Sequence, residues 1–217
     1  MPVFSHRSAL MDPDRRAGPF AVVAHTDAAG GSVKSFGRGV GMTIYPNTWT
    51  VLQWGDKINK GYKTAGGKSL DSILSAWELL GPLLVVCTAP NQVRNKQVVV
   101  MVDNEGSVRM YGKGWTTKCQ ICNTILVAIN EIAVALNAEV FVNKITRCSD
   151  DESKAADALS KMKLKYFRNL MPEANAAPQR IPLALYKWIQ DPKEDRFLGL
   201  KILTEMSKNT LLLGYNV

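Results

Sequence analysis

The chain lacks the features of a secreted or membrane-embedded protein. Its longest apolar run, residues 73–89, is interrupted by Glu78 and Pro82, and it falls short of the roughly 20 residues that a membrane span needs. The N-terminal stretch MPVFSHRSALMDPDRRAGP is polar and has no apolar segment of the kind found in a secretory signal. We therefore expect an intracellular protein, in the cytoplasm or the nucleus, with no membrane partner.

Cysteine and histidine are also scarce, with four cysteines and two histidines in the chain. Cys119 and Cys122 have the spacing of metal ligands, but no second pair follows and neither histidine is near them in sequence. The pair falls inside a helical pattern, where small apolar residues simply pack. We therefore expect reduced thiols in the core rather than a structural zinc site.

The composition that remains is that of an ordinary globular protein with a basic surplus. The 217 residues are 46% hydrophobic and 21% charged, which suits one large domain or one domain with an appendage. The net charge of +8 and a pI near 9.4 favour a polyanionic partner, nucleic acid first. Charge alone leaves a basic protein with no such partner equally open.

Hydrophobic patterning predicts an α/β protein with the element order β-β-β-α-β-α-β-α. The predicted strands are residues 20–24, 36–45, 49–54, 97–102 and 139–145, and the first three form an antiparallel meander. The predicted helices are residues 70–84 with a break near Ser75, 117–137, and one that starts with a capping box at 149–152. A meander followed by crossovers predicts a five-stranded mixed sheet flanked by helices.

Four carboxylates stand out against this pattern. Asp27 and Asp103 each follow an apolar run, and the carboxyl ends of neighbouring parallel strands lie at one edge of an open sheet. Glu78 and Asp157 lie in helical stretches. Buried carboxylates are costly unless they are paired or hold a cation, so four that converge would indicate bound Mg²⁺.

Each carboxylate also has an interpretation without function. Asp27 would suit a turn at a strand end, Asp103 a turn with Asn104 and Gly106, and Asp157 the start of a helix. Glu78 is harder to explain in this way, because an unpaired buried glutamate is penalised.

The motifs around these carboxylates resemble ribonuclease H. The resemblance is carried by Thr26-Asp27-Ala28-Ala29-Gly30, Glu78-Leu79, Asp103-Asn104 and Ala156-Asp157-Ala158-Leu159-Ser160, and it covers roughly residues 19–163. The Ala-Asp-Ala-Leu-Ser motif is most similar to ribonuclease H domains that follow reverse transcriptases in retroelements. Within these, residues 98–161 resemble the tyrosine-recombinase, DIRS-like branch.

This resemblance implies a ribonuclease-H-like fold and two-metal hydrolysis of the RNA strand of RNA/DNA hybrids during reverse transcription. It assigns Asp27, Glu78, Asp103 and Asp157 as catalytic and metal-binding residues for two Mg²⁺ ions, with Mn²⁺ as a possible substitute. In this scheme Asp27 bridges the ions, Glu78 and Asp103 hold the ion on the leaving-group side, and Asp157 holds the ion on the nucleophile side. A reverse transcriptase domain of the same polyprotein is the implied protein partner.

The chain departs from many cellular members of the family in one loop. Those members carry a histidine before the last helix, whereas residues 145–153 contain none. Retroelement members often lack this histidine too, so a slower enzyme, or one that uses Arg147 differently, is compatible with the sequence.

Basic residues are the expected contacts to the phosphate backbone, and they give salt-dependent affinity without reading sequence. The candidates are Lys57, Lys60, Lys63 and Lys68 in a polar loop, and Arg109, Lys113 and Lys118 after the fourth strand. Trp115 lies among the second group and would suit either a nucleic-acid groove or the core.

The sequence divides into three predicted parts and leaves two other functions open. We expect a linker over residues 1–18, the ribonuclease-H-like domain over 19–163 and a helical extension over 164–217, with helices near 181–190 and 197–207. The extension has no assigned chemistry and is expected to pack on the core or on a partner. The alternatives are an inactive scaffold of the same fold that binds nucleic acid or a polymerase, and a DNA nuclease of that fold.

Overall fold

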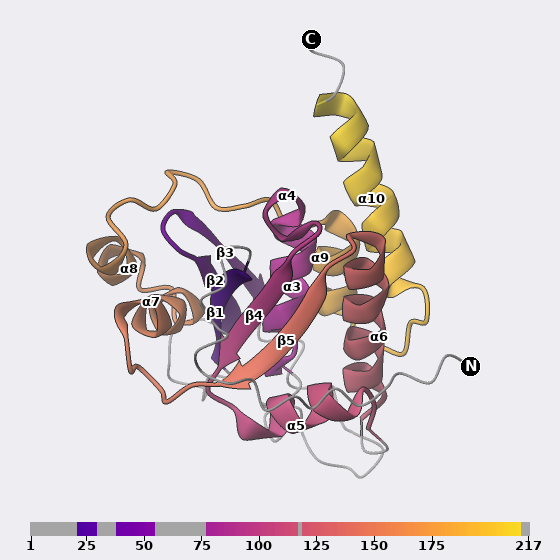
Figure 1. Cartoon of the computed structure of the whole chain (residues 1–217), viewed down its shortest axis with the longest axis horizontal. Helices are drawn as coiled ribbons and strands as arrows, with labels where there is room; N and C mark the ends of the chain where they lie inside the picture. The colour runs from indigo at the N-terminus through magenta and orange to yellow at the C-terminus, as the bar shows by residue number, and fades with distance from the viewer. Residues whose placement is uncertain (1–20, 30–37, 55–76, 117–118, 214–217) are drawn as a thin grey trace.

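The computed structural model describes residues 21–29, 38–54, 77–116 and 119–213 and centres on one five-stranded mixed sheet (Figure 1). Its strands are β1 (Ala21–Ala29), β2 (Arg38–Ile44), β3 (Thr48–Trp54), β4 (Gln97–Val102) and β5 (Glu139–Lys144). The spatial order is β3-β2-β1-β4-β5. Strands β1 to β3 pair antiparallel, whereas β4 runs parallel to β1 and β5 parallel to β4. The predicted fold class, a meander followed by parallel crossovers, is confirmed.

Helices cover both faces of the sheet. Helices α7 (Asp151–Ser160) and α8 (Leu164–Leu170) lie on one side, and α3 (Leu80–Thr88) and α6 (Gln120–Ala135) lie on the other (Figure 1). Every residue of α3 is buried, as expected for a helix that is apolar all round and sandwiched between a sheet and other helices. Strand β4 is buried from Val98 to Val102, and Val98, Val100 and Val102 pack in the same apolar cluster as α3 and α6.

Two glycines allow the helices to approach the central strands closely. A Cβ at Gly41 on β2 would lie 2.6 Å from the Leu159 Cβ on α7, and a Cβ at Gly81 on α3 would lie 2.6 Å from the Thr26 Cβ on β1. No side chain fits at either point without displacing a neighbour. These contacts bring α7 against β2 and α3 against β1, the strand that carries Asp27.

Several predicted boundaries change. Strand β1 continues to Ala29, so Asp27 lies within the strand rather than after it. The capping box at the start of α7 is present, but its N-cap is Asp150 and its partner is Ser153. Helix α3 begins after a turn at Leu79, with Pro82 in the first turn, where a missing N–H costs no intrahelical hydrogen bond.

Two helices of the described core region were not predicted, α4 (Pro90–Val93) and α5 (Glu105–Lys113). Helix α8 lies at the start of the predicted helical extension, where only helices near 181–190 and 197–207 were expected. Asn104 caps α5 by accepting a hydrogen bond from the Ser107 N–H, and Gly114 ends it in a left-handed conformation. Helix α5 has only one buried residue, Ser107, so its sequence carries no strong apolar stripe that would predict a helix.

The C-terminal residues form α9 (Leu183–Gln190) and α10 (Leu198–Leu213) (Figure 1). Helix α10 packs against α6 and α3, and α9 contacts α10 and β3. Leu185, Trp188 and Ile202 belong to the same buried cluster as α3 and α6. The Glu205 carboxylate on α10 accepts hydrogen bonds from the Leu183 and Ala184 N–H groups at 2.8 and 3.0 Å, which satisfies donors at the start of α9. This extension therefore shares the core of the sheet.

The segment between α8 and α9 covers the edge strand β3. The Asn175 and Gln179 N–H groups donate to the carbonyls of Asn47 and Trp49 at 2.8 and 2.7 Å. Arg168 donates to carbonyls of this segment and lies 5.0 Å from the centroid of the Trp49 ring. An edge covered in this way has fewer free backbone groups for pairing with another chain.

Candidate metal centre

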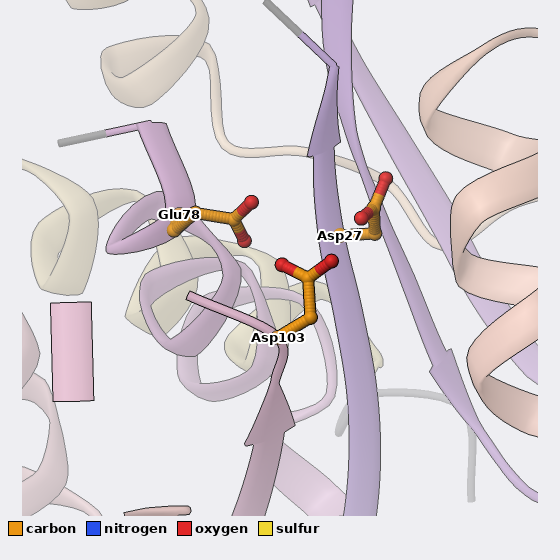
Figure 2. Close-up of side chains that lie close together, drawn as sticks. All are labelled: Asp27, Glu78 and Asp103. Atoms are coloured by element: carbon orange, nitrogen blue, oxygen red, sulfur yellow. The ribbon is translucent and has the colours of Figure 1, made fainter. Parts of the chain in front are cut away.

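Three of the four carboxylates converge at one edge of the sheet. Asp27 lies on β1, Asp103 follows β4, and Glu78 is in the helical residues just before α3. One oxygen from each lies within 4.8 Å of the others. Figure 2 shows the carboxylates of Glu78 and Asp103 pointing toward each other, with Asp27 beside them.

The sheet register explains why two of them meet. His25 on β1 pairs with Met101 on β4 in the parallel ladder. Two residues further along each strand direction are Asp27 and Asp103, at the point where the sheet changes from antiparallel to parallel. This is the switch point at which open α/β sheets bind ligands. Glu78 reaches the same place because α3 crosses β1 closely at Gly81.

Glu78 is the most deeply buried of the three, with only 1% of its surface exposed. Its Oε1 accepts a hydrogen bond from the Ala28 N–H at 3.4 Å, while Oε2 is buried without a hydrogen-bond partner. Burial raises the pKa of Glu78 well above its ordinary value, and the charges of Asp27 and Asp103 raise it further. Without a bound cation, the site therefore disfavours the ionised form of Glu78.

Asp27 is held by one strong contact. The Ser160 Oγ on α7 donates to the Asp27 Oδ2 at 2.5 Å. Burial raises the pKa of Asp27, and the hydrogen bond from Ser160 opposes that rise. The negative charges of Asp157 and Asp103 also raise the pKa of Asp27. Binding of a proton or a cation would relieve this repulsion between the carboxylates.

Asp157 stands beside this group and is paired with cations. It lines the same small pocket as Asp27, Asp103 and Arg147. The Arg147 Nη2 lies 3.1 Å from the Asp157 Oδ1, and Lys161 pairs with the same oxygen. Burial raises the pKa of Asp157, but hydrogen bonds from Lys161 and Arg147 outweigh it and bring the pKa below its ordinary value.

Arg147 links two of the carboxylates, because its Nε also lies 3.5 Å from the Asp103 Oδ2. The hydrogen bond to Asp157 raises the pKa of Arg147. Arg147 comes from the loop between β5 and α7, the loop in which the family resemblance leads one to look for histidine.

The residues present fit a hard divalent cation. The three converging groups offer only carboxylate oxygens, the ligands that Mg²⁺ and Mn²⁺ prefer. The unpartnered Glu78 Oε2 and the mutual repulsion of the three groups are what a bound cation would relieve.

Sequence reasoning missed Ser160 and Lys161 as neighbours of the site. Both follow Asp157 within about one helical turn, the spacing at which side chains share a helix face. The Ala-Asp-Ala-Leu-Ser motif contained Ser160, but only the approach of α7 to β1 shows that its hydroxyl reaches Asp27. His25 also lines the pocket, 3.9 Å from Asp150, and burial lowers its pKa.

Few of the predicted phosphate contacts can be placed. Arg109 and Lys113 are exposed on α5, and Arg109 pairs with Glu105 at 2.5 Å. Trp115 is 61% exposed, so it is not part of the core. The remaining candidates lie outside the described residues; they are Lys57, Lys60, Lys63, Lys68 and Lys118. The predicted linker over residues 1–18 also lies outside them.

No family model matches the chain, and no curated protein matches its sequence. Among solved structures, ribonuclease H1 from the halophilic archaeon Halobacterium salinarum NRC-1 is similar at 13% identity, with a TM-score of 0.48 over 67% of this chain and 98% of that one. LC11 ribonuclease H1 in complex with an RNA/DNA hybrid has 14% identity and a TM-score of 0.44, over 66% of this chain and 99% of that one. LC11 ribonuclease H1 isolated from compost has 14% identity and a TM-score of 0.40, covering 67% and 98%. At these values the likeness carries no argument about function, which rests on this chain's own residues.

In the part of the chain that the structure describes, no helix has the length and apolarity needed to cross a membrane.

Proposed function

We propose that this protein is a divalent-metal-dependent ribonuclease H that cuts the RNA strand of RNA/DNA hybrids. One observation carries the proposal: Asp27, Glu78 and Asp103 converge, largely buried, at the switch point of a mixed sheet. These are the residues that the sequence motifs single out. Convergent carboxylates with a buried, unpartnered oxygen are costly to keep unless they bind a cation.

Asp27, Glu78, Asp103 and Asp157 would hold two Mg²⁺ ions, or Mn²⁺ in their place. When bound, such ions lower the pKa of an attacking water and neutralise the leaving oxygen. Asp157 lies in the same pocket as Asp27 and Asp103, which supports its inclusion in the set.

The chain's own residues orient these ligands. The Ser160 hydroxyl fixes one oxygen of Asp27, and the Ala28 N–H fixes one oxygen of Glu78. Arg147 and Lys161 hold positive charge against Asp157, where a phosphate group of the substrate would otherwise meet only carboxylates. The site is therefore built from fixed carboxylates and nearby cations, as phosphodiester chemistry requires.

The substrate and biological context rest on the sequence motifs. A hybrid duplex offers 2′-hydroxyls across a wide minor groove, and the exposed Arg109 and Lys113 are candidates for phosphate contacts. The Ala-Asp-Ala-Leu-Ser motif on α7 is the reason to place the protein in a retroelement, of the DIRS-like branch, beside a reverse transcriptase of the same polyprotein.

The test is cleavage of an end-labelled RNA/DNA hybrid in Mg²⁺, beside RNA duplex and DNA duplex controls. Wild-type protein should cut only the hybrid, and Asp103→Asn should bind the hybrid without cutting it. Asp191→Asn is the matched control, because Asp191 is an exposed carboxylate in the C-terminal extension, and it should cut like wild type.

The other outcomes separate the alternatives. Binding without cutting by the wild-type protein would favour a scaffold of the same fold. Cutting of the DNA duplex would favour a DNA nuclease. Wild-type rates in Asp103→Asn would show that the site is assigned wrongly.

A further inference from the structure

The Cys119-Gln-Ile-Cys122 segment lies at the start of α6. Cys119 is the N-cap of this 16-residue helix, with an extended backbone at φ −151° and ψ 106°. Its Sγ accepts a hydrogen bond from the Cys122 N–H at 3.3 Å. This hydrogen bond holds the Cys119 sulfur against the first turn of α6, at the backbone of Cys122.

This arrangement differs from two cysteines inside a regular helix. Residues three apart on a helix have Cβ atoms about 5–6 Å apart, whereas a disulfide needs about 3.5–4.5 Å. The extended backbone of Cys119 leaves the helical path and turns its side chain back over the first turn. A Cys119–Cys122 disulfide would therefore join the N-cap to the first turn of α6 without requiring a bond between two residues of the regular helix.

The two thiols differ in the way that exchange chemistry needs. Cys119 is partly exposed, while Cys122 is fully buried in the core cluster. The hydrogen bond from the Cys122 thiol, together with backbone N–H groups of the first turn, lowers the pKa of Cys119 to about 7. At neutral pH this gives roughly 15-fold more thiolate than an ordinary cysteine of pKa about 8.5.

The pair does not complete a metal site within the described residues. The group of three or more potential ligands found there is the acidic one at Asp27, Glu78 and Asp103, and it contains neither cysteine. The other two cysteines lack a partner thiol: Cys87 is buried, and Cys148 is exposed on the loop between β5 and α7.

We propose that Cys119 and Cys122 form a redox-active dithiol that low-molecular-weight disulfides convert reversibly into a Cys119–Cys122 disulfide. The Cys119 thiolate attacks one sulfur of the small disulfide, forms a mixed disulfide and releases one small thiolate. Cys122 then loses its proton and attacks the Cys119 sulfur, which releases the second small thiol. The protein loses two electrons and two protons, and one small disulfide becomes two thiols.

This inference is independent of the proposed nuclease activity, since neither cysteine lines the acidic pocket. Oxidation would tie the N-cap of α6 to its first turn covalently. Asn123, the next residue of that turn, already holds the preceding loop through hydrogen bonds with the Thr116 N–H and carbonyl at 2.7 and 2.8 Å. The disulfide would therefore fix the connection between α5 and α6.

The test equilibrates the folded, reduced protein in buffers of reduced and oxidised glutathione. Samples are quenched with acid, alkylated with a maleimide and digested with trypsin. Cleavage after Lys118 and Lys144 releases residues 119–144, which contain both cysteines of the pair and neither of the others. As the buffer becomes oxidising, this peptide should lose both alkylation sites together and carry no glutathione.

Two variants check the assignment of roles. Cys122→Ala should stop the reaction at a glutathione adduct on Cys119, and Cys148→Ser should leave the wild-type result unchanged. The wild-type measurement needs no variant to fold. Two alkylatable thiols in residues 119–144 at the most oxidising ratio, or modification of Cys148 while the pair stays reduced, would overturn the proposal.

Discussion

Replacing Glu78 with glutamine tests the electrostatics of the acidic cluster directly. Glu78 is 1% exposed. One of its carboxylate oxygens lies within 4.8 Å of a carboxylate oxygen of Asp27 and of one of Asp103. Glutamine has the same shape without the charge, and its amide can donate to the neighbouring carboxylates. We therefore expect Glu78→Gln to stabilise the metal-free protein.

The magnitude follows from the distances. Two unit charges 4.8 Å apart repel by about 3.5 kcal/mol at an effective dielectric constant of about 20. Burial raises the pKa of Glu78, and the charges of Asp27 and Asp103 raise it further, so Glu78 relieves part of this repulsion by holding a proton. We expect a net gain of about 2 kcal/mol in the free energy of unfolding, or about 4–8 °C in Tm for a chain of this size.

The dependence on pH has a definite sign. The folded-state pKa of Glu78 lies well above its ordinary value of 4.5. Stability is therefore full below about pH 4.5 and is lost as the pH rises through the raised folded pKa. Glu78→Gln should remove this loss, so its advantage over wild type should grow from pH 4.5 upward.

The assay is thermal unfolding followed by circular dichroism, with EDTA and with Mg²⁺. Mg²⁺ at 100 times its Kd should stabilise the wild-type protein by about 2.7 kcal/mol, and Glu78→Gln should gain much less. Glu131→Gln is the matched control, because Glu131 also has a buried unpartnered oxygen but lies outside the cluster; its response to Mg²⁺ should match wild type. A Glu78→Gln protein that is no more stable than wild type in EDTA and responds equally to Mg²⁺ would refute this reasoning.

Three further substitutions, one of them with a matched control, test other contacts. Gly41→Ala should destabilise the protein by about 3 kcal/mol in urea unfolding, because its Cβ would meet α7. Gly112→Ala, on the open side of α5, should stabilise it by about 0.5–1 kcal/mol. Equal effects of the two substitutions would contradict the close packing of α7 on β2. Ser160→Ala should cost about 1.5–3 kcal/mol in the same assay, because Asp27 loses a buried donor; a neutral result would count against that hydrogen bond. Arg147→Gln should tighten Mg²⁺ binding about fivefold in calorimetric titration, since a competing cation of modest strength is removed; weaker binding would mean that Arg147 does not compete.

The sheet and two of the site residues were accessible from the sequence because their signals are local. Apolar runs that end at Asp27 and Asp103 indicate strands, and the parallel arrangement of those strands brings their ends together. Glu78 was identifiable because an acidic residue in an otherwise apolar helix needs a partner. The convergence of these three residues agrees with the prediction, while their catalytic role stays a proposal.

The neighbours that tune the site were not accessible, because they depend on packing between distant segments. Ser160 reaches Asp27 only because Gly41 lets α7 approach the sheet. The pairing of Asp157 with Arg147 depends on the path of the loop before α7. No sequence spacing encodes either contact.

Helix α5 was missed for a related reason, and the sequence left open whether the C-terminal helices pack on the core or on a partner. Helix α5 buries only Ser107, so it lacks a strong apolar stripe, and its clearest signals are the Asn104 cap and the terminal Gly114. The C-terminal helices join the core through Trp188 and Ile202, and Glu205 caps α9 from the neighbouring helix. Periodicity predicts such helices but does not show which surface they cover.

The most direct test of the central claim is the rate of RNA/DNA hybrid cutting as a function of Mg²⁺ concentration, for wild type and Asp27→Asn. Wild-type protein should cut with saturable dependence on Mg²⁺ and not at all in EDTA. Asp27→Asn should be at least about 100-fold slower, which corresponds to about 2.7 kcal/mol of lost transition-state stabilisation, while remaining folded because one repelling charge is gone. Cutting in EDTA at the rate seen in Mg²⁺, or a wild-type rate in Asp27→Asn, would contradict the assignment of this carboxylate cluster as a metal-dependent nuclease site.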